Sequence, residues 1–240
     1  MIASLTECFD FSKFFKLGKE LKIVKEIPEV NHRSVKEIQL VGRGAFGSVY
    51  KAVFNTKIVA MKVFENKNDQ FLNEMKNLCT LIHPNIVEFV GKCVGTEEHG
   101  LSFFIEWMDN GSLNQLIYNP KIVYSLGRLL SWCKQCSDAL MFMHQYNFAH
   151  RDLKPDNMLL SNNYSKLKLT DFAIAKMIEK SMTAHQGTLF YMAPEVVAGN
   201  TKYNVKCDIY SFGIILWELF ARRVPYKNFG TSYSLSVKIV

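Results

Sequence analysis

Cysteine and proline are scarce in this chain, with six of each among 240 residues. Only Cys133 and Cys136 lie close together, and no second pair follows at the spacing of a zinc ribbon. The sequence therefore argues against a disulfide-stabilised scaffold and against a zinc module. Both cysteines fall in a segment of helical periodicity, where cysteine usually acts as a small apolar residue. We expect a reduced, cytoplasmic protein.

Long hydrophobic runs are also missing. The most apolar stretch, residues 209–220, contains Ser211, Gly213 and Glu218 and is too short to cross a bilayer. The N-terminus lacks the continuous apolar segment of a secretory signal. We therefore expect no transmembrane segment and interpret residues 209–220 as part of a buried helix.

Negative charge is the scarcer sign, since 22 Asp and Glu oppose 29 Lys and Arg and leave a net charge of +7. This excess fits either a basic groove for nucleic acid or an ordinary solvated surface. A local run of lysines occurs only within the first 25 residues. We favour the ordinary surface and expect no nucleic-acid partner.

Residues 1–35 have a pattern of their own, with a lysine at every third position and Phe and Leu between. The lysines are Lys13, Lys16, Lys19, Lys22 and Lys25. A basic amphipathic helix on a membrane or a partner is one interpretation. A three-residue period, however, drifts around a helix instead of holding one face. We therefore expect a loosely ordered N-terminal arm.

Periodicity divides the remaining chain into a strand-rich and a helix-rich part. Residues 36–64 read as strands, and the alternation in KIVAMKVF puts Ala60 and Lys62 on one face and Val59 and Met61 on the other. From residue 69 the period becomes helical until His83-Pro84. The apolar positions of this helix are Phe71, Met75, Leu78 and Ile82.

Helical patterns dominate after Asn110-Gly111. An apolar stripe runs through residues 129–143, short strands and loops occupy roughly 148–175, and a long helix is expected at 207–221. Strands first and helices afterwards predict an α+β protein with two lobes.

The segment VGRGAFGSVYKAVF, residues 41–54, carries a G-x-G-x-x-G frame made by Gly42, Gly44 and Gly47. A dinucleotide-binding fold would continue from these glycines into a helix, but a strand pattern follows here. The remaining interpretation is a hairpin whose backbone amides approach phosphate oxygens. On its own, this frame would indicate little more than a glycine-rich turn.

Further blocks follow in a fixed order. VAMK supplies Lys62 one strand after the glycines, and FLNEMKNL supplies Glu74, a carboxylate placed to hold that lysine. HRDLKPDN spans residues 150–157, DFA spans 171–173 and APE spans 193–195. This order is the protein-kinase signature, and the chain resembles that family over about residues 36–235. The phrases HPNIVEFVGKC and KCDIYSFGIILWELFARRVPY are similar to MAP kinase kinase kinases of the TGF-β-activated kinase type.

The resemblance implies a two-lobed α+β kinase fold. Residues 36–108 would form the strand-rich N-lobe and the hinge, and residues 109–240 a helical C-lobe that is truncated after the helix at 207–221. Related kinases continue through further helices, so we expect an exposed apolar patch, with poor solubility or a stabilising partner as the result.

The resemblance also implies that ATP and Mg²⁺ bind this chain. The glycines would cover the phosphates, Lys62 paired with Glu74 would bind two of them, and the hinge backbone would pair with adenine. The implied nucleotide-binding residues are Val41, Gly42, Gly44, Gly47, Val49, Ala60, Lys62, Glu74, Ile105, Glu106 and Met108.

By the same resemblance, Asn157 and Asp171 would bind Mg²⁺, Asp152 would accept the proton of the substrate hydroxyl, and Lys154 would neutralise charge on the transferred phosphate. A lysine two positions after the catalytic aspartate resembles Ser/Thr kinases. Asp208 would anchor the backbone of the catalytic loop, with helix capping as the alternative.

Residues 171–195 would form the activation segment, which contains the hydroxyls of Ser181, Thr183 and Thr188. Thr183 aligns best with the phosphorylated threonine of the family, and a phosphate there could pair with Arg151 and order the segment. We expect phosphorylation of Thr183 to raise activity.

One residue departs from the family pattern, because Ala173 stands where the family has glycine. If the active state requires a positive φ at this position, the methyl group would cost about 1–2 kcal/mol. That cost corresponds to roughly ten- to thirty-fold in rate, which is impairment without abolition.

The sequence therefore predicts a Ser/Thr kinase. By resemblance its protein substrates would be MAP kinase kinases in stress or immune signalling, with an adaptor or activator protein as a further partner. The alternative is a pseudokinase that acts as a scaffold or dominant-negative regulator. Ala173 favours the alternative, and the presence of Lys62, Asp152, Asn157 and Asp171 favours the enzyme.

Overall fold

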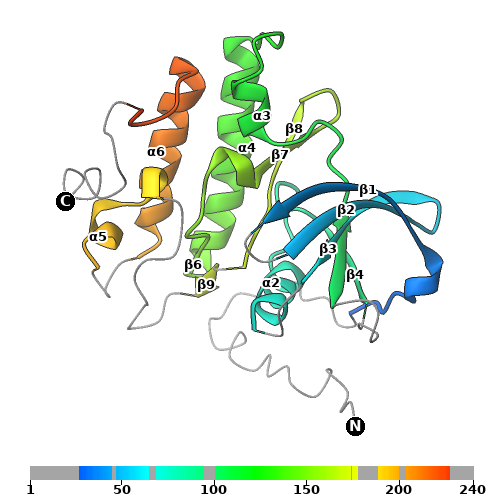
Figure 1. Cartoon of the computed structure of the whole chain (residues 1–240). Coiled ribbons are helices and arrows are strands. Elements are labelled where there is room, and N and C mark those ends of the chain that lie inside the picture. Colours follow the sequence, from blue (N-terminus) through cyan, green and yellow to red (C-terminus); the bar gives the residue numbers. More distant parts are fainter. Residues whose placement is uncertain are drawn as a thin grey trace.

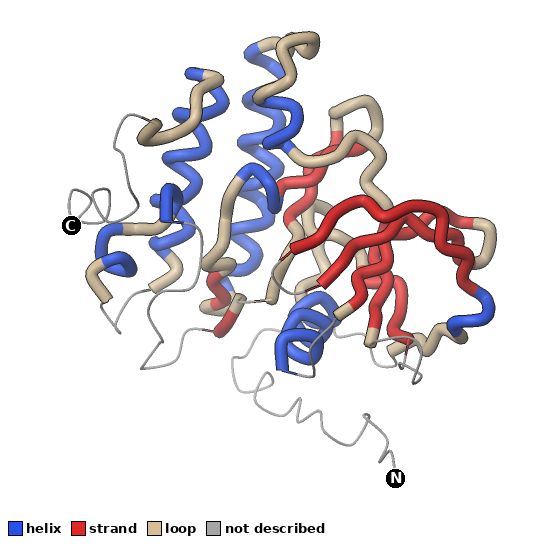
Figure 2. Tube along the Cα trace, viewed as in Figure 1, coloured by secondary structure: helices blue, strands red, loops and turns tan. Residues whose placement is uncertain are grey.

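The computed structural model describes residues 27–44, 47–64, 69–93, 101–173, 175–177, 189–199 and 204–227. The N-terminal arm predicted for residues 1–35 therefore lies mostly outside the described residues. Figure 1 shows a curved sheet with one helix against it and, beside them, a group of helices that includes α4 and α6. Figure 2 shows the same division by secondary structure, with strands gathered at one side and most helices at the other.

The sheet has five antiparallel strands in the order β1-β2-β3-β5-β4. Its strands are β1 (Val35–Gly44), β2 (Gly47–Phe54), β3 (Lys57–Val63), β4 (Phe89–Cys93) and β5 (Ser102–Glu106), and the short 3₁₀ helix η1 (His32–Ser34) precedes them. Consecutive hairpins place Val49 opposite Lys62 and Ala60 opposite Ile105. The prediction of strands across residues 36–64 agrees with β1 to β3.

The two faces of β3 bury different side chains. Ala60 belongs to a large cluster shared with the helices, whereas Val59 and Met61 belong to a second cluster with Ala52 and Phe104. Alternate side chains of a strand point to opposite faces, so Lys62 lies on the face that is turned toward the helices. This is the arrangement that the alternation in KIVAMKVF predicted.

Helix α2 (Asp69–Thr80) buries Phe71, Met75 and Leu78 as predicted, but it ends before Ile82. The Thr80 hydroxyl donates to the Lys76 carbonyl oxygen at 2.8 Å, and the Ile82 amide bonds the Thr80 carbonyl instead of continuing the helical ladder. Ile82 is therefore 47% exposed. The prediction that Ile82 lies in the apolar stripe of the helix was wrong.

The helical part contains α3 (Leu113–Ile117), α4 (Leu126–Gln145), α5 (Pro194–Val197) and α6 (Lys206–Ala221). Between them lie β6 (Phe148–Ala149), η2 (Pro155–Asn157), β7 (Met158–Ser161), β8 (Lys166–Leu169), β9 (Lys176–Met177) and η3 (Leu189–Tyr191). Strands β7 and β8 form one antiparallel pair, and β6 and β9 form another. The expected helix at 207–221 corresponds to α6 within one residue.

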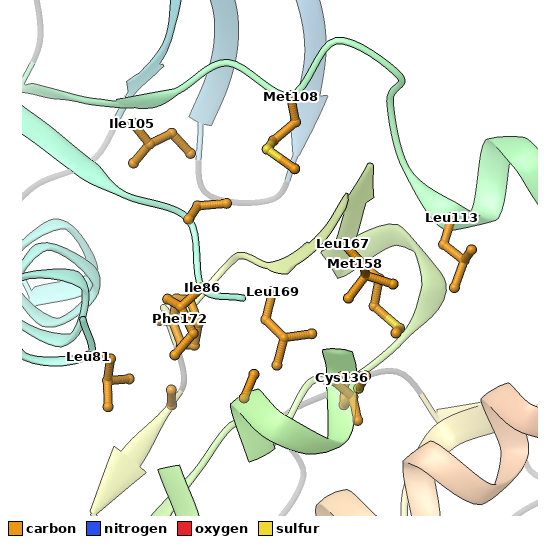
Figure 3. Close-up of a cluster of buried hydrophobic side chains, with 14 of the residues drawn as sticks. Leu81, Ile86, Ile105, Met108, Leu113, Cys136, Met158, Leu167, Leu169 and Phe172 are labelled. Carbon is orange, nitrogen blue, oxygen red and sulfur yellow. The ribbon is translucent and has the colours of Figure 1, made fainter. Parts of the chain in front are cut away.

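One hydrophobic cluster joins the sheet to the helices. It includes Met75 and Leu78 of α2, Trp132 and Cys136 of α4, and Phe172. Figure 3 shows side chains of this cluster that arrive from separate parts of the chain, among them Ile105, Leu113, Leu169 and Phe172. Among the described residues, every helix is too short or too polar to cross a bilayer.

Candidate active site

Three charged side chains from separate elements meet between the sheet and the helices. Lys62 of β3 donates to both carboxylate oxygens of Glu74 of α2, at 2.8 and 2.7 Å, and to Oδ1 of Asp171 at 3.2 Å. The Glu74 side chain is 2% exposed, while that of Asp171 is 29% exposed. The structure thus brings together three residues that the sequence analysis assigned to one site.

Burial and charge act in opposite directions on this cluster. Burial raises the pKa of Glu74 to about 7, although the Lys62 ammonium opposes this rise. For Lys62, burial alone would lower the pKa, but the Glu74 and Asp171 carboxylates outweigh burial and raise it. Lys62 is consequently an ammonium at every physiological pH.

A pocket of about 490 Å³ lies beside the charged cluster. It is lined by most of the predicted nucleotide-binding and metal-binding residues: Val41, Gly42, Val49, Ala60, Lys62, Glu74, Ile105, Glu106, Met108, Asn157 and Asp171. Among the described residues of the predicted set, Gly47, Asp152 and Lys154 do not line it. The pocket thus combines apolar side chains with the charged groups of the cluster.

The carboxylate of Glu106 is held by two residues that do not line this pocket. That carboxylate pairs with the buried Lys168 of β8 and accepts a hydrogen bond from the Glu88 amide at 2.7 Å. Since the side chain is engaged there and the Glu106 amide donates to the Glu88 carbonyl at 3.0 Å, the Glu106 carbonyl is the part that can serve a ligand. The sequence analysis likewise assigned the adenine contact to the backbone of this segment.

The loop after β6 places Asp152, Lys154 and Asn157 together. Lys154 Nζ lies 2.7 Å from Asp152 Oδ2, and the Asn157 amide nitrogen donates to the Asp152 carbonyl at 2.8 Å and to Oδ2 at 3.2 Å. Because Asn157 uses its nitrogen on Asp152, its amide oxygen is the atom that can bind a cation. Pro155 starts the turn η2 that brings Asn157 back toward Asp152.

Asp208, in the first turn of α6, holds the backbone of this loop in place. Its carboxylate accepts the backbone amides of His150 and Arg151, each at 2.9 Å, and lies 2.8 Å from Nε2 of His144. The N-cap of α6 is Val205, which makes no side-chain capping bond. The geometry therefore supports the anchoring role for Asp208 over the capping alternative.

The glycines of the hairpin formed by β1 and β2 have different surroundings. Gly47 has φ +144°, and a Cβ built on it would lie 2.0 Å from the Val63 carbonyl oxygen. A Cβ on Gly42 would meet no heavy atom within 4 Å. The fold itself thus requires glycine at position 47, whereas the space at Gly42 opens on the pocket.

Sequence reasoning missed several residues of the pocket wall. Leu159, Thr170, Ser112, Gln115, Asp109 and Asp156 also line it. Leu159 was the most accessible to prediction, because it lies two positions after HRDLKPDN in a short apolar strand. Ser112 and Gln115 form a capping box at the start of α3, and the spacing S-x-x-Q is a signal for it.

The activation segment is described only in part, and Ser181, Thr183 and Thr188 lie outside the described residues. At its start, Ala173 is not among the residues with positive φ; Asp171 is, at 63°. The condition under which the Ala173 methyl group would impair the site is therefore not met in this conformation. Ala173 is instead buried within a turn closed by a bond from the Ala175 amide to the Phe172 carbonyl, 3.2 Å.

Comparison with known proteins agrees with this geometry. Residues 35–238 match the family model of the protein kinase domain. Human mitogen-activated protein kinase kinase kinase 7 is 37% identical over 214 residues, which cover 86% of this chain and 34% of the human protein. A putative mitogen-activated protein kinase kinase kinase 7-like protein of Drosophila melanogaster is 36% identical, over 84% of this chain and 53% of its own length.

A third relative is mitogen-activated protein kinase kinase kinase mom-4 of Caenorhabditis elegans, which is 34% identical over 85% of this chain and 40% of its own length. The chain thus spans between a third and about half of the length of these relatives. The predicted resemblance and the predicted kinase fold are confirmed by the family match. This chain belongs to the protein kinase family.

Proposed function

We propose that this protein transfers the γ-phosphoryl group of ATP to serine or threonine hydroxyls of protein substrates. The observation that carries the proposal is the convergence of Lys62, Glu74 and Asp171 beside an apolar pocket. Phosphoryl transfer depends mainly on positioning and on neutralisation of charge, and this cluster has the groups for both tasks.

The residues present fit ATP and Mg²⁺. Val49, Ala60 and Met108 give the pocket an apolar end suited to adenine, and the backbone of residues 106–108 would pair with the base. Asp171 and the amide oxygen of Asn157 are hard oxygen donors of the type that Mg²⁺ prefers. When bound, the metal nucleotide supplies the reactive phosphoryl group, while Lys62 would hold and orient its inner phosphates.

Asp152 is the group we assign to the substrate hydroxyl. Its carboxylate is held by Lys154 and Asn157 and by a loop that Asp208 anchors, so it is pre-oriented to accept a proton. Lys154 would place positive charge beside the transferred group. Restraint of this kind lowers the cost of reorganisation in the transition state.

Substrates and partners are proposed from the relatives alone. These relatives are named as MAP kinase kinase kinases, so we propose MAP kinase kinases in a stress or immune cascade as substrates. An adaptor or activator protein and a cytoplasmic location complete the proposal. We also propose that residues 36–108 form the N-lobe with the hinge and that residues 109–240 form the C-lobe.

The test is phosphotransfer from labelled ATP to a MAP kinase kinase, with Asp152→Asn as the inactive reference. Asp138→Asn serves as the matched control, because Asp138 is a half-buried residue of α4 that pairs with Lys134 of the same helix and does not line the pocket. We expect transfer by the wild type and by the control but not by Asp152→Asn. Nucleotide binding with equal, background transfer by all three would instead select the pseudokinase scaffold.

A further inference from the structure

We propose that Asn77 is a positioning residue that fixes the start of the activation segment so that Asp171 faces Lys62. The assignment rests on the proposed function, since it concerns the residue to which metal binding was assigned. Asn77 lies on α2, three residues after Glu74, and is 7% exposed. A buried carboxamide needs partners for its polar atoms, so the identity of those partners is informative.

The side-chain amide of Asn77 donates both of its N–H groups to the activation segment. Nδ2 lies 2.8 Å from the Phe172 carbonyl oxygen and 2.9 Å from the Ala175 carbonyl oxygen, across 95 and 98 positions of the chain. These carbonyls flank the turn that contains Ala173. One side chain of α2 therefore clamps both ends of this turn.

Asp171 needs such restraint because its φ of 63° lies in the left-handed region. That conformation is unfavourable for most L-residues and persists where the surroundings enforce it. On one side of Asp171, the Thr170 amide bonds the Asn157 carbonyl and the Thr170 carbonyl lies 3.0 Å from Nε2 of His150. On the other side, Asn77 donates to the Phe172 carbonyl. Hydrogen bonds to both neighbours of Asp171 therefore restrain its backbone.

Ala173 contributes to the same restraint. An alanine has fewer backbone conformations than a glycine, so it lowers the entropy lost when the turn forms, provided that its φ is compatible. Its φ lies outside the left-handed region here. The hydrogen bonds of Asn77 and the restricted backbone of Ala173 thus favour the same arrangement. In this arrangement α2, Lys62 and Asp171 meet.

Hydrogen exchange tests the proposal without any need for catalysis. Asn77→Leu keeps the branched shape and the number of heavy atoms and removes both donors, and Asn73→Leu is the matched control on the exposed side of the same helix. We expect amides of residues 172–177 to exchange at least about fivefold faster in Asn77→Leu than in the control, because local opening sets the rate. Equal exchange in both variants would overturn the proposal. Asn77→Ser, which is too short to reach either carbonyl, replaces Asn77→Leu if that variant does not fold.

Ligand affinity separates positioning from a general loss of structure. Asn77→Leu should weaken Mg²⁺–ATP binding about tenfold, a coupling of ordinary size between sites, and leave adenosine affinity within about twofold. Asn77→Gln, which keeps both N–H groups, should recover part of the loss. Equal loss for both ligands would refute positioning. A wild type that binds Mg²⁺–ATP but transfers no phosphate would refute the proposed catalysis and leave this comparison intact.

Discussion

The Lys62 ammonium lies 3.2 Å from the Asp171 carboxylate, although 109 positions separate the two residues. Glu74 shares the same ammonium at 2.7 Å. Above about pH 7, where Glu74 is ionised, two carboxylates therefore share one cation and the cluster retains one negative charge. A site of this kind attracts a further cation, as the proposed Mg²⁺ position requires.

Replacement of Asp171 should separate metal-dependent chemistry from binding of the base. We expect Asp171→Asn to lower phosphotransfer by about 10²–10³-fold, the usual loss when a charge-stabilising group is removed. Adenosine affinity, measured by calorimetry, should stay within about twofold because the base contacts other residues. Full activity in Asp171→Asn would contradict the assignment, and Asp138→Asn is the control.

The raised pKa of Glu74 predicts a pH effect on stability. An ordinary glutamate titrates near 4.5, whereas burial raises this pKa to about 7, so between these values the folded state binds more protons than the unfolded state. Stability from this group is therefore present below pH 4.5 and is lost as the pH rises through 7. Urea unfolding of wild type and Glu74→Gln from pH 5 to 8 should show the wild type losing stability relative to the variant. A constant difference would exclude the shift.

The two glycines provide a matched pair of substitutions. Gly47→Ala should lower the free energy of unfolding by about 1–3 kcal/mol, because its Cβ would collide with the Val63 carbonyl in a backbone conformation reserved for glycine. Gly42→Ala should change stability by less than about 0.5 kcal/mol, since its Cβ meets open space. Thermal unfolding decides between them, and equal losses would show that the hairpin adapts.

Ala173 should prove harmless to activity. Because its φ is not positive, Ala173→Gly removes no strain and adds conformational freedom that costs roughly 0.5–1 kcal/mol. We expect turnover within about threefold of the wild type and a slightly lower melting temperature. A tenfold gain in turnover would revive the view that this alanine impairs the enzyme.

Removal of the Asp208 anchor should affect stability and catalysis together. Asp208→Asn lowers the acceptor strength of a buried group that holds two backbone amides and His144. We expect a loss of about 1.5–3 kcal/mol in unfolding free energy, the range for hydrogen bonds to charged groups, and weaker transfer even in the folded fraction. Chemical denaturation and a transfer assay at low temperature measure the two effects.

Strand alternation and the order of the sequence blocks together predicted much of the fold and of the candidate site. Alternation placed Lys62 and Ala60 on the same face of β3, and ordered blocks identified residues that the structure brings within hydrogen-bond distance. Other features depend on partners far along the chain. Ile82 has the right phase for α2, yet the helix ends at Thr80 and the Ile82 amide bonds the Thr80 carbonyl instead. Asn77 looks like an ordinary helix residue, because its partners are carbonyls 95 and 98 positions away.

The pairing of Glu106 with Lys168 limits how the cleft can open. Glu106 ends β5 in the sheet, and Lys168 belongs to β8 beside the helices, so their ion pair joins the two halves of the molecule next to the pocket. A motion that preserves this contact has to pivot about it, so the parts of the cleft farther from the pair move by larger amounts. Entry and departure of a ligand would then proceed by rotation, and a lateral slide of one half over the other would first have to break a partly buried charge pair.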